Sequence, residues 1–160
     1  MRKMLAILIV GLLVLSPISA MAAAKLNTQL IDDAKQALSL MSYGEYKKAV
    51  KLLHFAKNAP TASELSDFVD ENLPELYSCT VQSDVAVAYL ADSAWRIAVP
   101  LESPSSDSVN ALVLRAKNGK HFDNYKAMPW YDVMAEVDSA QKVIWQDAYD
   151  PGDVYIVADN

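Results

Sequence analysis

The spacing of apolar residues changes once along this chain, near Tyr77, and this change constrains the fold more than any other feature. Before it, apolar residues recur at the i, i+3, i+4, i+7 spacing of a helix with one buried face. After it, they alternate with other residues at the period of two that is typical of strands. Helices followed by strands predict an α+β domain, with the N-terminal helices packed on one face of a curved antiparallel β-sheet.

Two helices are predicted to come first and to pack antiparallel, because only a short turn at Gly44 separates them. Asn27 or Thr28 can cap the first helix. Its polar residues Asp32, Asp33, Lys35 and Gln36 should face outward. The expected buried residues are Leu30, Ile31, Ala34, Ala37, Leu38 and Met41 in the first helix, and Tyr46, Ala49, Val50, Leu53 and Ala56 in the second. His54, on the other side of the second helix, is expected to face solvent.

A third helix is predicted from Thr61, because Thr61 and Glu64 have the spacing of a capping box. Its apolar residues repeat at helical spacing up to Leu76. Pro74 lies inside this pattern, and proline removes a backbone donor and clashes with the preceding turn. We therefore expect a kink or break near Leu73.

The next segment has two interpretations. The alternation in Val85–Leu90 and Trp95–Leu101 predicts two strands joined by a tight turn at Asp92-Ser93. The same alanine-rich stretch could instead form one buried helix, since short apolar runs fit both periods. The segment Ser103–Ser108 that follows is expected to be a loop.

Asn118-Gly119 predicts a two-residue type I′ hairpin turn, because both positions of that turn need positive φ. Strands over Val109–Lys117 and Lys120–Tyr125 would then pair so that opposed residue numbers sum to 237. The more apolar face, expected to point inward, would carry Leu112, Leu114, Ala116, His121, Asp123 and Tyr125. The outward face would carry Val113, Arg115, Lys117, Lys120, Phe122 and Asn124.

Three strands are expected after this hairpin. Alternation in Tyr131–Asp138 predicts the first, Gln141–Ala148 is a candidate for the second, and Val154–Ala158 is a short final strand.

Residues 1–24 have the three parts of a cleavable signal peptide: basic Arg2 and Lys3, an apolar run, and a small-residue stretch. The run is shorter than the roughly 20 residues that span a bilayer, so no stable membrane anchor is expected. Small residues favour cleavage after Ala24, which leaves Lys25 first; cleavage after Ala22 is the alternative. We therefore expect residues 25–160 to form a single α+β domain that is periplasmic or secreted and soluble.

Charge and cysteine content limit what the exported domain can be. The whole chain has a net charge of −6, and losing two cations with the signal leaves −8, which argues against nucleic acid as a partner. Cys79 is the one cysteine, so no intramolecular disulfide can form. Its apolar surroundings favour a buried, inert thiol over a nucleophile or an intermolecular disulfide.

The helical pair with its junction Met41–Ala49, the third helix, and the entry Ser83–Val87 into a strand resemble the nuclear transport factor 2-like superfamily. The resemblance implies a curved sheet wrapped around helices to form a cone with a pocket at its open end. The long tail rich in Trp and Tyr after Gly119–Phe122 departs from that family. Its members include isomerases, dehydratases and non-catalytic binding domains, so the fold does not name a function.

His121 and Asp123 are the candidate catalytic residues. On the predicted hairpin they lie two residues apart on one face, and a His beside a carboxylate can act as a general base. A ligand-orienting role and a purely structural or exposed role are the alternatives. With two His and one Cys, and none at ligand spacing, we expect no metal and no cofactor. Asp147, Asp150 and Asp153 lack the EF-hand pattern and predict a solvated acidic turn.

Most aromatic residues lie at or after Tyr77, and they suit either a core or a binding surface. Tyr125, Trp130, Tyr131 and Trp145 are the candidate ligand-binding residues. The favoured hypothesis is therefore a non-catalytic exported domain that binds a small molecule or a protein partner at the aromatic end of its sheet. The alternatives are a proton-transfer isomerase or dehydratase that uses His121 and Asp123, and an acidic envelope inhibitor or immunity-type protein.

Overall fold

The computed structural model describes residues 24–78, 85–101, 109–146 and 155–156 of the chain. The first half contains α1 (Gln29–Ser42), α2 (Tyr46–Leu53), α3 (Ala62–Asn72) and the 3₁₀ helix η1 (Pro74–Tyr77). The second half contains β1 (Ala86–Ala91), β2 (Ala94–Pro100), β3 (Asn110–Ala116), β4 (Asn124–Pro129), α4 (Trp130–Asp138), β5 (Lys142–Gln146) and β6 (Tyr155–Ile156). The strands form one antiparallel sheet in the order β4-β3-β2-β1-β5-β6, so the predicted α+β class is confirmed.

Several predictions concern positions outside the described residues. They are the signal peptide up to residue 23, the setting of Cys79, the loop Ser103–Ser108 and the acidic turn at Asp147, Asp150 and Asp153. Of the predicted final strand Val154–Ala158, the described part is β6.

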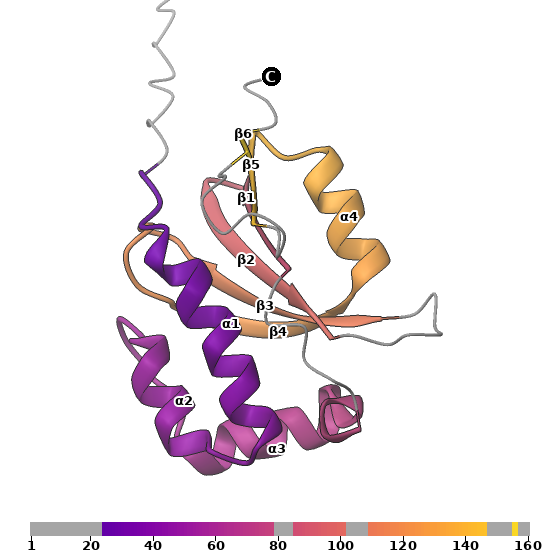
Figure 1. Ribbon diagram of the computed structural model, residues 1–160. Coiled ribbons are helices and arrows are strands. Elements are labelled where there is room, and N and C mark those ends of the chain that lie inside the picture. The colour runs from indigo at the N-terminus through magenta and orange to yellow at the C-terminus, as the bar shows by residue number, and fades with distance from the viewer. Residues whose placement is uncertain (1–23, 79–84, 102–108, 147–154, 157–160) are drawn as a thin grey trace, which may run out of the picture.

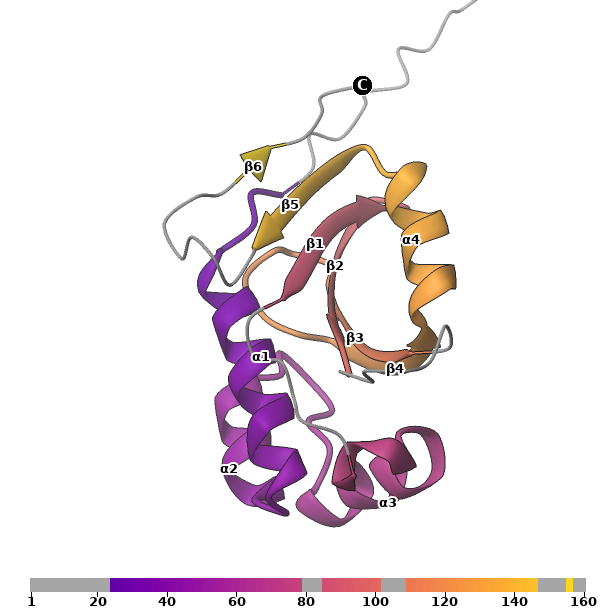
Figure 2. The same cartoon turned by 45° about the vertical axis from the view of Figure 1, so that its right-hand side comes forward.

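Helices cover both faces of the sheet. Figure 1 and Figure 2 show α1 and α2 on one side of the strands and α4 on the other. Two separate clusters of buried side chains correspond to these faces, and β2 contributes Ile97 and Val99 to one and Ala98 to the other. The expectation that helices cover one face is thus wrong for α4, because the sequence after β4 turns back across the sheet as a helix.

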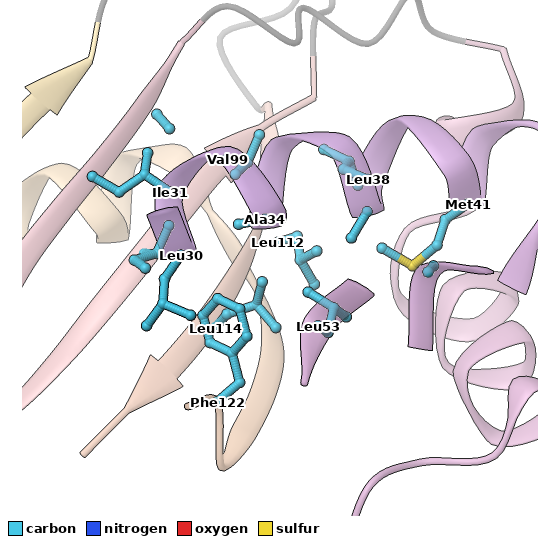
Figure 3. Packing of buried hydrophobic residues seen from close by; sticks show 14 of the residues in the cluster. Leu30, Ile31, Ala34, Leu38, Met41, Leu53, Val99, Leu112, Leu114 and Phe122 are labelled. Atoms are coloured by element: carbon cyan, nitrogen blue, oxygen red, sulfur yellow. The ribbon is translucent and has the colours of Figure 1, made fainter. Parts of the chain in front are cut away.

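The predicted buried face of α1 is confirmed. Figure 3 shows its side chains pointing at Leu53 of α2 and at Val99, Leu112 and Leu114 of the sheet. One residue differs: Asp33, expected to face outward, is 9% exposed and accepts a hydrogen bond from Gln29 Nε2 at 3.1 Å.

Local signals set the ends of α1. The Oδ1 of Asn27 accepts from the amide of Gln29 at 3.2 Å, so Asn27 rather than Thr28 supplies the side-chain cap. Gly44 has φ +73°, and the amides of Gly44 and Glu45 donate to the carbonyls of Met41 and Leu40. This is a Schellman motif, and it produces the short turn into α2.

The second helix is shorter than predicted. It ends at Leu53, because His54 adopts a left-handed conformation with φ 42°. Ala56 therefore lies outside the helix and is exposed, and its amide donates to the carbonyl of Phe122 at 2.9 Å. His54 is exposed, as predicted.

The start and end predicted for α3 are both confirmed. Thr61 Oγ1 accepts from the amide of Glu64 at 3.2 Å, and the Glu64 carboxylate accepts from the amide of Thr61 at 2.7 Å. These hydrogen bonds hold the pKa of Glu64 below its usual value. The helix ends at Asn72, and η1 begins at Pro74.

The two-strand interpretation of the next segment is confirmed, and the one-helix alternative is wrong. β1 and β2 pair directly, and Asp92 and Ser93 between them have φ 51° and φ 60°. Positive φ at both positions is the signature of the type I′ hairpin turn.

The hairpin predicted at Asn118-Gly119 is wrong in its turn and register. Leu114 pairs with Tyr125, so opposed residue numbers sum to 239, and seven residues connect β3 to β4. Gly119 has φ +66°, whereas the Oδ1 of Asn118 accepts from the amides of Lys120 and His121. Phe122, expected to face outward, is fully buried because it belongs to this connection and not to a strand.

The segment Tyr131–Asp138, predicted as a strand, is helix α4. Its buried residues are Val133 and Val137. They are four positions apart, a separation that fits about one helical turn and also the two-residue period of a strand. The pattern therefore fits both periods, and packing against the sheet decides between them. The candidate strand Gln141–Ala148 is confirmed over the range of β5.

Candidate functional site

An open groove of about 580 Å³ lies between the first turns of α2 and α3. A volume of this order is within the range of small-molecule sites. Two tight local structures position it: the Schellman turn at Gly44 sets the start of α2, and the capping box sets the start of α3. The groove is lined by Gly44, Glu45, Tyr46, Lys47, Lys48, Ala62, Ser63, Ser66 and Asp67.

Tyr46 is the one aromatic residue in this lining, and a hydrogen-bond chain fixes its ring. Tyr77 donates its hydroxyl proton to Asp70 Oδ1 at 2.7 Å and shares a very short hydrogen bond with the Tyr46 hydroxyl, so Tyr46 is the donor in that pair. Desolvation of the Tyr77 hydroxyl and these two hydrogen bonds raise the pKa of Tyr77.

Several polar groups of the groove are not used by the fold. Lys48 pairs with Glu45 at 2.6 Å. In contrast, Lys47, Ser63 and Asp67 make no side-chain hydrogen bond or ion pair within the described part of the chain. A cation, a hydroxyl and a carboxylate are therefore available to a ligand beside the Tyr46 ring.

The four aromatic residues predicted to bind ligand do not form one surface. Tyr125 packs edge-on against Phe68, with ring centroids 4.8 Å apart, on the face covered by α1–α3. Trp130 and Trp145 meet on the α4 face at 6.4 Å in a T-shaped contact. Tyr131, next to Trp130, is 80% exposed.

His121 and Asp123 do not form the expected pair, because both lie in the connection between β3 and β4. His121 is exposed. The Asp123 carboxylate instead accepts from Arg115 Nε and, at 2.8 Å, from the amide of Lys117. Neither residue lines the groove between α2 and α3.

Glu136 ties α4 to the sheet. Its Oε2 accepts from the hydroxyl of Tyr89 at 2.6 Å and from Arg96 Nη1 at 2.8 Å. Its Oε1 lies 3.7 Å from the Lys126 ammonium. Burial, together with the hydrogen bond to Glu136, raises the pKa of Tyr89.

The exposed side of α3 and η1 is an acidic surface whose position was not predicted from the sequence. It carries five carboxylates and Tyr77, which is 51% exposed. A sequence signal was present, because no Lys, Arg or His occurs between Lys57 and Arg96. The groove had no such signal, since it arises from the packing of α2 on α3. The carboxylates are Glu64, Asp67, Asp70, Glu71 and Glu75.

Comparison of the chain with protein-family models, curated proteins and solved structures finds no match. Within the described ranges, no helix is long and apolar enough to cross a membrane. The same part of the chain contains no group of three or more His, Cys, Asp or Glu side chains arranged to hold a metal ion.

Proposed function

We propose that this chain is an exported, non-catalytic binding domain and that it binds a small zwitterionic molecule, such as an amino acid or a short peptide, in the groove between α2 and α3. The observation that carries the proposal is the groove itself, with unpaired groups of both charge signs beside a fixed tyrosine ring. Asp67 suits an ammonium group and Lys47 suits a carboxylate, while Tyr46, which is 9% exposed, closes the groove toward the core.

The arrangement supports binding rather than catalysis. The one candidate base that the sequence offered, His121, lies outside this groove, and the Asp123 carboxylate is paired with Arg115. Three helices before an antiparallel sheet agree with the predicted resemblance to the nuclear transport factor 2-like superfamily, which includes non-catalytic binding domains. Export also stays a prediction, supported by the three-part N-terminal segment.

A set of free amino acids and dipeptides, added to the ¹⁵N-labelled protein, tests the proposal by amide chemical-shift mapping. We expect saturable shifts at Lys47, Ser63 and Asp67. Ser63→Trp should fill the groove and abolish them, whereas Ala135→Trp, which places a tryptophan on the exposed side of α4, should leave them intact. Absence of saturable shifts, or shifts that survive Ser63→Trp, would refute the proposal.

The acidic surface of α3 and η1 favours a second candidate, an envelope inhibitor or immunity-type protein that recognises a basic secreted enzyme. A panel of secreted enzymes of high isoelectric point, assayed with and without the protein, tests it. Inhibition should weaken at high ionic strength and in the Glu71→Lys, Glu75→Lys double variant, since both changes reduce electrostatic attraction. Inhibition that is insensitive to salt and to these substitutions would exclude this candidate.

A further inference from the structure

A second, smaller cavity lies on the α4 side of the sheet. It measures about 100 Å³ and is lined by Arg96, Val113, Arg115, Asn124, Tyr125 and Lys126. Arg96, Arg115 and Asn124 are directly opposed across β2, β3 and β4, and Val113 pairs with Lys126 in the next row on the same face. Four side chains that donate hydrogen bonds or carry positive charge are thus brought together by strand register.

The opposition of Arg96 and Arg115 needs an explanation, because like charges directly across a strand pair are destabilising. Arg96 is neutralised within the fold: its Nη1 donates to Glu136 and its Nη2 donates to Asp92 at 3.0 Å. The charge of Arg115 is balanced by Asp123, but that carboxylate accepts only from the Nε of Arg115 and leaves its Nη donors unused within the described residues.

The remaining donors of the cavity have no acceptor in the described residues. Within the described residues, neither Nη group of Arg115 donates to an acceptor, and neither does the Nδ2 of Asn124. The Oδ1 of Asn124 accepts from the amide of Tyr125 at 2.8 Å. The Lys126 ammonium, at 3.7 Å from Glu136, is beyond ordinary hydrogen-bond distance. Arg115 is half-exposed, with a side-chain exposure of 45%, so a ligand can reach it from solvent.

We propose that this cavity binds a small oxyanion, the phosphate or carboxylate group of a small molecule. A guanidinium group with two free Nη donors suits bidentate contact with such a group, and the lysine and the asparagine amide add donors around it. The size of the cavity limits the ligand to one compact group. The net charge of the whole chain is −6, which repels polyanions such as nucleic acid more strongly than it repels a small anion.

Inorganic phosphate and succinate, each titrated into the ¹⁵N-labelled protein at constant ionic strength, test this proposal and distinguish the two oxyanion chemistries. We expect saturable shifts at the amides of Arg115, Asn124 and Lys126 with at least one of them. Arg115→Gln should weaken that binding at least tenfold. Lys120→Gln also removes one positive charge, from the connection that follows β3 and outside the cavity, and it should leave the affinity within twofold of the original.

Two results would overturn the proposal: no saturable shift with either anion, or equal weakening by Arg115→Gln and Lys120→Gln, which would show general electrostatic attraction. If Arg115→Gln proves unstable, Lys126→Gln serves in its place, because Lys126 makes a single long-range ion pair in the described structure. The groove between α2 and α3 shares no lining residue with this cavity, so each proposal can fail without the other.

Discussion

Gly119 offers a sharp test of how the N-terminal segment is held. Its φ of +66° is one that side chains other than glycine adopt at a cost of about 1 kcal/mol or more. A Cβ at this position would lie 2.5 Å from the carbonyl oxygen of Lys25 and 3.1 Å from its carbonyl carbon. Because both atoms belong to the backbone, a side-chain rotation cannot relieve the clash, and the segment itself must move.

Movement of that segment would break specific contacts. The amide of Asn27 donates to the carbonyl of Gly119 at 2.7 Å, a hydrogen bond that contributes about 1 kcal/mol. Leu26, which is 6% exposed, would lose part of its burial. Losing roughly half of a leucine's transfer free energy costs about 1 kcal/mol. Together with the conformational term, we expect Gly119→Ala to lower the free energy of unfolding by about 3 kcal/mol.

Gly44→Ala is the matched control. Gly44 has a similar φ of +73°, but a Cβ there would have no neighbour within 4 Å, so only the conformational cost of about 1 kcal/mol applies. Urea unfolding of both variants, followed by circular dichroism, measures the difference, which should be about 2 kcal/mol. Equal destabilisation of the two variants would show that the close approach to Lys25 contributes nothing, and the reasoning would be wrong.

Three further predictions concern the helix cap at Thr61, the buried Tyr89 hydroxyl and the N-terminus of the exported chain. Thr61→Ala should lower the free energy of unfolding by about 1 kcal/mol in urea denaturation, because it removes the capping box; an unchanged midpoint would contradict this. Tyr89 has a raised pKa, so its stabilising effect is complete below about pH 10 and is lost as the pH rises further, when the unfolded chain ionises first. Urea unfolding between about pH 8 and pH 11 should therefore show a fall in stability that is smaller in Tyr89→Phe, and equal slopes would refute this assignment. The sequence favours cleavage after Ala24, whereas the structure favours the alternative after Ala22, because the Trp95 indole donates to the carbonyl of Ala24 at 2.6 Å. Mass spectrometry of the exported chain should therefore give Ala23 as its first residue; a chain that begins with Lys25 would show that this hydrogen bond is dispensable.

The features that the sequence predicted correctly are those in which a few neighbouring residues decide the outcome. The Thr61 capping box, the break at Pro74 and the left-handed Gly44 each depend on the chemistry of one turn. The burial of α1 was also predictable, because its apolar residues fit one helical face and no other period.

The features that were missed depend on contacts between distant parts of the chain. The β3–β4 connection is longer than a two-residue turn, and in it Gly119 contacts Lys25 while Phe122 fills the core; neither contact has a local signal. The register error is two residues, which preserves the faces, so Leu114 and Tyr125 still point toward α1–α3.

The candidate site was harder to predict than the fold. The sequence pointed to aromatic residues and to His121 with Asp123, whereas the groove is built by the first turns of two helices whose mutual packing has no motif. The basic cavity similarly depends on the opposition of Arg96 and Arg115, and that opposition follows from the pairing of β2 with β3.

The covering of the sheet by helices on both sides has a consequence for how the chain can assemble. Every residue of Ala86–Leu90 in β1 is buried, and this stretch has no charge, so alternation of apolar and polar residues cannot protect it from self-association. The three N-terminal helices cover one side of the sheet, and the other side is covered by α4, which follows β4 in the chain. A chain truncated before Trp130 loses α4 and also β5, the strand that pairs with β1, so both a face and an edge of the buried strand are uncovered. That chain should aggregate in sedimentation assays where the full chain does not, and a soluble truncated chain would contradict this. The last helix therefore protects the second face of the sheet from self-association.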